Sequence, residues 1–93
     1  MAERKVVVAS SVGLHARPAA LLVSEAGKQP AAVSIAKAPA TEFVDARSIL
    51  SVLGLGARCG DEVVLRAEGP GAEASLDAVA AVIAHDHDTA PAS

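Results

Sequence analysis

The chain has 93 residues, a length that suits one domain and is short for two. Its 8 Lys and Arg against 11 Asp and Glu give a formal net charge of -3, which disfavours a nucleic-acid binder, because such proteins gain affinity by neutralising phosphates. With 52% hydrophobic and 20% charged residues, the chain has enough apolar material for a core. The single cysteine can form no internal disulfide, and no apolar run is long enough to cross a membrane. We therefore expect a cytoplasmic protein without membrane insertion.

The first half of the chain predicts a strand, a helix and a pair of strands. A β-branched run over residues 4–9 indicates the first strand, and turn-forming residues end it. Apolar residues recur every three or four positions over residues 16–26, which indicates an amphipathic helix that ends at Gly27. Alternating side chains over residues 32–36 and 42–45, joined by a short connection, indicate an antiparallel hairpin.

The second half predicts a short helix, a strand and a long helix. Residues 49–55 form the short helix, with Ser48 at its start. Residues 62–67 alternate as a strand, and residues 72–84 carry apolar side chains at helical spacing. The complete order predicts an α+β fold, an open-faced β-sandwich in which a four-stranded antiparallel sheet carries three helices on one face.

The run GLHARP, residues 13–18, is the most informative stretch of the sequence. It places His15 immediately before the predicted first helix and Arg17 in the first turn. The free N–H groups and the positive dipole end at a helix start favour an anion, and Pro18 suits the first turn. His15 is therefore predicted to be a nucleophile that faces an anion site, where the Ala16 and Arg17 amides bind phosphate and the Arg17 side chain stabilises it.

A plain structural role is the alternative interpretation of the same run. A histidine before a helix is usually a surface residue or an N-cap, and a proline in the first turn is a common helix starter. For an arbitrary histidine this interpretation is the better one. The combination of Gly, His, Arg and Pro within six residues favours a functional site instead.

The same run, continued to Ala19, resembles the active-site signature of HPr, the histidine-containing phosphocarrier family of the bacterial phosphoenolpyruvate-dependent sugar phosphotransferase system. The similarity covers nearly the whole chain, including RSIL at residues 47–50 and LGLG at residues 53–56. The resemblance implies that His15 accepts a phosphoryl group on Nδ1 from phosphorylated enzyme I and passes it to a histidine of a sugar-specific IIA protein or domain. Arg17 is then its electrostatic partner. The chain is expected to be a monomeric carrier rather than an enzyme, without a cofactor, whose partners supply the catalysis.

The RSIL motif contains a candidate regulatory residue and part of a candidate docking surface. Ser48 stands where the resemblance implies a serine on which a kinase and a phosphorylase act in many Gram-positive bacteria, and plain N-capping explains it equally well. Phosphate there would put charge beside the apolar docking residues. The expected partner-docking residues surround the phosphate site: Leu14, Ala20, Arg47, Ile49, Leu50 and Leu53. Of these, spacing favours Leu53 as a core residue and Leu50 as a contact.

The remaining signals carry little chemistry. The alternating histidines and aspartates of residues 85–88 contain metal-ligand types but no shaped site, so we predict no metal. They belong to a polar stretch, residues 85–93, that we expect to be the flexible tail of a single domain over residues 1–93. A rival function is a regulatory interaction module of the same fold, acting through Ser48 or the docking surface. The intact GLHARP run favours the carrier.

Overall fold

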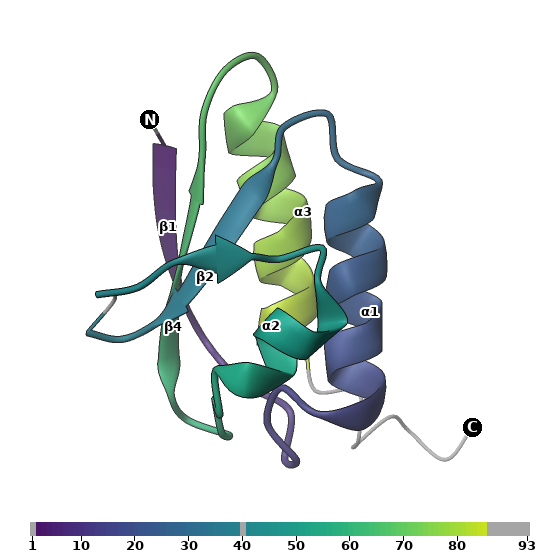
Figure 1. Ribbon diagram of the computed structural model, residues 1–93, viewed down its shortest axis with the longest axis vertical. Helices are drawn as coiled ribbons and strands as arrows, with labels where there is room; N and C mark the ends of the chain where they lie inside the picture. The colour runs from purple at the N-terminus through teal and green to yellow at the C-terminus, as the bar shows by residue number, and fades with distance from the viewer. Residues whose placement is uncertain (1, 40, 86–93) are drawn as a thin grey trace.

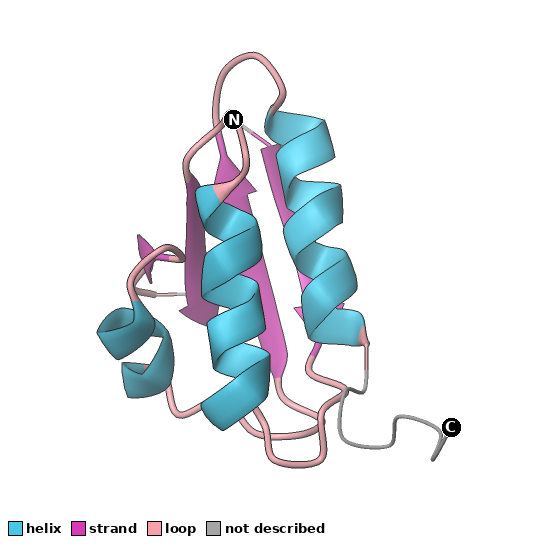
Figure 2. Ribbon diagram, turned by 90° about the vertical axis from the view of Figure 1, so that its right-hand side faces the viewer, coloured by secondary structure: helices cyan, strands magenta, loops and turns pink. Residues whose placement is uncertain are grey.

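Strands and helices of the chain form two layers in a computed structural model that describes residues 2–39 and 41–85 (Figures 1 and 2). The elements in chain order are β1 Ala2–Val7, α1 Ala16–Gly27, β2 Val33–Lys37, β3 Val44–Asp45, α2 Ile49–Gly54, β4 Glu62–Ala67 and α3 Ala72–Ala84. The strands form one antiparallel sheet in the order β1-β4-β2-β3, and the three helices cover one face of it. The predicted fold class and element order are confirmed.

The face of the sheet beneath the helices carries the core. Leu65 of β4 lies opposite Arg4 of β1, and the Arg4 guanidinium pairs with Glu73 of α3 at 3.0 Å, which identifies this face as the helix side. Because side chains alternate along a strand, Val63 shares this face with Leu65, and both are fully buried as predicted. The predicted hairpin is also present, with β2 paired antiparallel to β3.

The two long helices run side by side across the sheet, and the short α2 contacts α1 and β3 (Figure 2). Leu22 of α1 and Leu76 of α3 are fully buried, so the predicted apolar stripes face the core. Burial of one leucine side chain contributes about 1.5–3 kcal/mol. These contacts fix the N-terminal end of α1, where the GLHARP run lies, relative to α2.

Several predicted element boundaries are wrong. β1 begins at Ala2 rather than at residue 4, β2 spans Val33–Lys37 rather than residues 32–36, and α2 ends at Gly54 rather than at residue 55. The first strand ends at Val7 rather than at residue 9, because the next two N–H groups bond outside the sheet: Val8 to the Asp61 carbonyl at 2.9 Å and Ala9 to the Ile83 carbonyl at 3.2 Å. The third strand is expected over residues 42–45, but β3 spans only Val44–Asp45, because only these two residues pair with β2. The expected tail lies outside the described residues apart from its first residue.

Candidate functional site

His15 immediately precedes α1, as the sequence predicts. Its backbone is extended, with φ -130° and ψ 168°, and its carbonyl oxygen accepts a hydrogen bond from the Ala19 N–H at 3.3 Å. The imidazole makes no capping hydrogen bond to the helix, and the residue is exposed. The ring is therefore accessible to a partner protein.

The first turn of α1 presents backbone donors at the end of the helix. The N–H groups of Ala16 and Arg17 have no carbonyl one turn earlier in the helix to bond, and Pro18 has no N–H. Ala16 and Arg17 are exposed, whereas Pro18 is buried. The helix dipole puts partial positive charge at this end, and the Arg17 guanidinium adds a full charge. Together these groups can hold an anion beside His15.

Ala16 holds an unusual backbone conformation, with φ at 47° in the left-handed region. For a residue with a side chain this region costs about 1–2 kcal/mol, and residues in such conformations concentrate at functional sites. Ala16 links His15 to Arg17, so its conformation fixes the direction in which the chain passes from the imidazole into the helix. Sequence reasoning missed this feature, because alanine carries no signal for a positive φ.

A distant turn holds the loop before His15. The Leu14 N–H donates to the Ala57 carbonyl at 2.9 Å. Gly13 has φ at 75°, and a Cβ on it would lie 2.5 Å from the Ala57 oxygen and 2.8 Å from Arg58 Cα. Only a residue without a side chain permits this approach. The turn after α2 is thus a support of the site that sequence reasoning did not identify.

Ser48 caps α2, as predicted. Its Oγ accepts a hydrogen bond from the Ser51 N–H at 3.3 Å, and its carbonyl oxygen accepts one from the Val52 N–H at 3.0 Å. Serine is among the best residues for this position. The capping interaction accounts for the residue structurally, and its regulatory phosphorylation stays a prediction.

Arg47 is bound to Asp45 in front of α2. Its Nε and Nη2 donate to the two carboxylate oxygens at 3.1 Å each, and its backbone N–H donates to Oδ1 at 2.9 Å. The side-chain and backbone hydrogen bonds from Arg47 hold the pKa of the Asp45 carboxyl below its ordinary value, and Asp45 raises the pKa of Arg47. The pairing offsets much of the charge that Arg47 would offer to a partner.

The predicted docking residues separate into exposed and buried positions. Four of them are exposed: Ala20, Arg47, Ile49 and Leu50. Leu50 is the extreme case, with 80% of its surface exposed. Their exposure is compatible with docking, which no contact in the structure tests.

The prediction of Leu14 as an exposed docking residue is wrong. Its side chain is only 1% exposed and belongs to the core, because the bond to Ala57 draws the loop inward. The prediction of Leu53 as the core residue of α2 is also wrong in part. Leu53 is half-buried against the core, and its neighbour Val52 is the fully buried residue.

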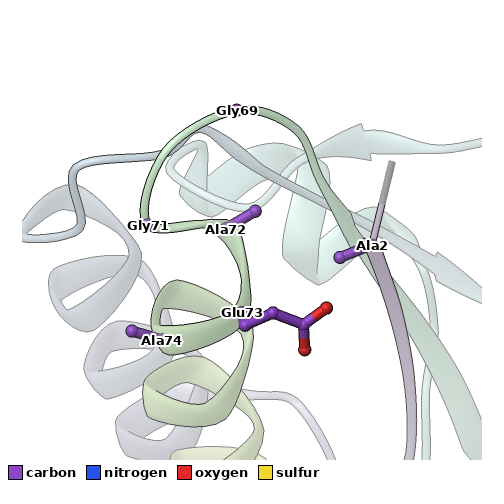
Figure 3. A pocket seen from close by; sticks show the side chains of 6 residues that line it. All are labelled: Ala2, Gly69, Gly71, Ala72, Glu73 and Ala74. Atoms are coloured by element: carbon purple, nitrogen blue, oxygen red, sulfur yellow. The ribbon is translucent and has the colours of Figure 1, made fainter.

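A separate hollow lies at the start of α3, away from the GLHARP run. It is lined by Ala2, Gly69, Gly71, Ala72, Glu73 and Ala74 (Figure 3). Glu73 is its one titratable side chain, and that carboxylate is paired with Arg4. Over residues 2–39 and 41–85, no group of three His, Cys, Asp or Glu is placed to hold a metal ion. No helix within the same ranges is long and apolar enough to span a bilayer.

The chain is similar to known proteins along nearly its whole length. A family model described as "PTS HPr component phosphorylation site" matches residues 2–85. The phosphocarrier protein HPr of Streptomyces coelicolor is 46% identical over 91 residues, which cover 98% of this chain and 97% of that protein. A crystal structure of HPr from Bacillus anthracis has a TM-score of 0.81 and 36% identity, with 88% of this chain and 95% of that chain covered. The structure of Crh, a Bacillus subtilis catabolite repression protein that forms a domain-swapped dimer, has a TM-score of 0.67 and 37% identity. The match covers 89% of this chain and 93% of Crh.

Proposed function

Because the chain belongs to the HPr family, the phosphocarrier proteins of the phosphotransferase system, we propose that His15 is the residue that carries its phosphoryl group. One observation carries this proposal: an exposed imidazole precedes a helix whose first-turn amides and Arg17 side chain can receive an anion. The chain itself changes covalent state, and its partners supply the catalysis.

The transfer consists of two exchanges at Nδ1 of His15. Neutral imidazole has one nitrogen with a lone pair and one with a proton, so Nδ1 attacks while Nε2 keeps the proton. The new bond from Nδ1 to phosphorus forms as the bond from phosphorus to phosphorylated enzyme I breaks. In the second exchange a histidine of a IIA protein or domain attacks the same phosphorus, and the bond to Nδ1 breaks.

The first turn of α1 stabilises the phosphorylated state to a limited degree. The Ala16 and Arg17 amides and the Arg17 guanidinium supply charge-assisted hydrogen bonds to the phosphate oxygens. All of these groups lie in exposed residues, where water competes and weakens each interaction. Moderate stabilisation suits a carrier, since a deeply enclosed phosphate would not pass to the next protein.

Exposed residues around the site form the surface for these encounters. Ala20, Ile49 and Leu50 supply apolar area, and Arg47 contributes to a polar rim, the usual arrangement of a protein interface. A monomer exposes this surface fully. The single free cysteine, Cys59, suits the reducing cytoplasm in which we place the protein.

Incubation with enzyme I and labelled phosphoenolpyruvate tests the proposal. We expect one phosphate per chain that is labile in acid and stable in base, and that is absent from His15→Ala. The matched control is His85→Ala, which removes another exposed imidazole and keeps incorporation. Retention of label by His15→Ala, or no incorporation by the wild-type chain, contradicts the proposal.

The second candidate is a regulatory interaction module that uses Ser48 or the docking surface. The similarity to Crh and the position of Ser48 beside exposed Ile49 and Leu50 favour it. A phosphate on Ser48 would place charge within that apolar surface and weaken docking. The incubation above separates the two candidates, because a purely regulatory module has no need to accept phosphate on His15.

A further inference from the structure

Half of the basic side chains are neutralised by carboxylates. Of the eight Lys and Arg residues, four form ion pairs: Arg4 with Glu73 and Asp77, Lys37 with Asp61, Arg47 with Asp45, and Arg66 with Glu3. Arg17 and Arg58 form no ion pair with any residue in the described part of the chain, although the chain is acidic overall. Arg17 is already part of the proposed phosphate site, so Arg58 is the guanidinium without an assigned role.

The backbone of Arg58 is fixed in a tight turn. Its N–H donates to Asp61 Oδ2 at 2.9 Å, and its carbonyl oxygen accepts from the Asp61 N–H at 2.9 Å. The turn is joined to the end of β1, since the Gly60 N–H donates to the Val8 carbonyl and the Val8 N–H to the Asp61 carbonyl, both at 2.9 Å. The Asp61 carboxylate pairs with Lys37 at 3.7 Å, and its contact with Arg58 is to the backbone N–H. Among the described residues the Arg58 guanidinium therefore has no ion pair.

The same turn touches the loop that carries His15. Arg58 Cα would lie 2.8 Å from a Cβ on Gly13, and the preceding Ala57 carbonyl accepts the Leu14 N–H. The chain position of Arg58 is thus fixed relative to a loop that ends at the imidazole two residues later. The residue is exposed, so its positive charge lies at the protein surface.

We infer that Arg58 is a docking cation, which attracts carboxylates on an acidic surface of enzyme I, the protein proposed to phosphorylate His15. The inference rests on the proposed function. The backbone of Arg58 lies against the loop at Gly13, on the N-terminal side of His15. The amides proposed to bind the phosphate, those of Ala16 and Arg17, lie on its C-terminal side. Val12, the residue before Gly13 in the chain, is half exposed, so the loop that Arg58 approaches carries exposed apolar surface, as the edge of an interface does.

A rim charge changes encounter more than chemistry. Opposite charges on two proteins speed their association, and salt screens this effect over a Debye length of about 8–10 Å at moderate ionic strength. Loss of Arg58 should therefore raise the KM of enzyme I for this chain, its phosphoryl acceptor, and leave kcat unchanged. The effect should shrink as salt is added.

Steady-state phosphorylation by enzyme I measures this effect at low and high ionic strength. We expect Arg58→Ala to raise KM about threefold to tenfold at low salt, and much less at 0.5 M NaCl. Arg58→Lys keeps the charge and should restore most of the wild-type KM. The control is Lys5→Ala, which removes the same charge from an exposed residue of β1 without an ion pair among the described residues, and should leave KM unchanged.

Three results would overturn the inference alone while His15 is still labelled: equal KM values for Arg58→Ala and Lys5→Ala, a loss in kcat with unchanged KM, or an Arg58→Lys variant as impaired as Arg58→Ala. Thermal unfolding of each variant detects a change in folding, and an Arg58→Gln variant replaces Arg58→Ala if the alanine variant is unstable. A wild-type chain that accepts no label would contradict the proposed function itself.

Discussion

The N–H of Leu14 donates to the carbonyl oxygen of Ala57 at 2.9 Å, and the two residues are both buried. This bond joins the loop before α1 to the turn after α2. It sets the position of His15 through the backbone, since the imidazole itself is exposed and makes no capping contact. The site therefore depends on contacts made by residues that have no chemistry of their own.

Gly13→Ala should lower the free energy of unfolding. The new Cβ would lie 2.5 Å and 2.8 Å from two backbone atoms of the turn, which cannot rotate away, and φ is 75°. A left-handed conformation and overpacking together suggest a loss of about 2–4 kcal/mol. Urea unfolding measures it.

The control for this substitution is Gly69→Ala. Gly69 has φ at 87°, but a Cβ there would meet no atom within 4 Å. It should lose only the conformational part, about 1–2 kcal/mol. Equal losses in the two variants would show that the approach of Gly13 to the turn contributes nothing.

Leu14→Ala and Leu50→Ala should have opposite consequences. Leu14 is 1% exposed, so its truncation should reduce the free energy of unfolding by about 2–5 kcal/mol. Leu50 is 80% exposed, so its truncation should change stability by less than about 0.5 kcal/mol. It should raise the KM of enzyme I for the chain. Unfolding curves and transfer kinetics of both variants check this. A stable Leu14→Ala with weakened docking would restore the sequence-based prediction for Leu14.

Features that depend on neighbouring residues could be predicted from the sequence. The apolar stripe and Pro18 lie within α1, and they place His15 at its start without knowledge of the rest of the chain. Ser48 as the cap of α2 is predictable for the same reason, because the bond to the Ser51 N–H is made three residues away. Local chemistry thus defines the outline of the site.

Features that depend on tertiary contacts could not be predicted. Nothing near Leu14 in the sequence indicates that Ala57 would bond to it and draw it into the core. On the two-turn α2, one position changes the direction of a side chain by about 100°, so apolar spacing alone could not decide between Val52 and Leu53. The left-handed Ala16 has no local signal either.

The Asp45–Arg47 pair should make stability depend on acid pH. Its hydrogen bonds lower the pKa of Asp45 from the ordinary 3.8, so the pair stabilises the fold above that pH and its contribution is lost as pH falls through the lower, folded-state pKa. Asp45→Asn should be less stable than wild type at pH 7 and should lose less stability in acid. The effect should be small because both side chains are about half exposed.

Urea unfolding at pH 7 and pH 3 measures this difference. The control is Glu68→Gln, which alters an exposed carboxylate that has no ion pair within the described residues. If Asp45→Asn lost as much free energy of unfolding between pH 7 and pH 3 as the wild type does, the pair would not respond to acid in this way.

Ser48 variants should separate capping from regulation. Ser48→Ala removes the acceptor for the Ser51 N–H and should cost about 1 kcal/mol of stability, with normal phosphate transfer. Ser48→Asp keeps a capping oxygen and stability, but adds charge beside Ile49 and Leu50 and should slow acceptance from enzyme I. Thermal unfolding and transfer rates report the two effects. Normal transfer by Ser48→Asp would leave Ser48 as a cap only.

Arg17→Ala should slow the chemical step without disturbing the fold. Arg17 is exposed, so its loss should change stability by less than about 0.5 kcal/mol. Removal of one group that stabilises developing charge typically lowers kcat tenfold or more, and we expect about tenfold to a hundredfold here. Lys28→Ala, at the other end of α1, is the matched control and should transfer normally.

Arg17 and Arg58 should act at different stages, which a double variant can show. Removal of Arg17, which is proposed to contact the phosphoryl group, should lower kcat, whereas removal of Arg58, which is proposed to act on the encounter, should raise KM. Independent effects multiply in kcat/KM, so Arg17→Ala combined with Arg58→Ala should lose the product of the two single losses. A double variant no worse than Arg17→Ala alone would mean that both guanidinium groups act on the same phosphate, and that Arg58 belongs to the phosphate site rather than to the docking surface.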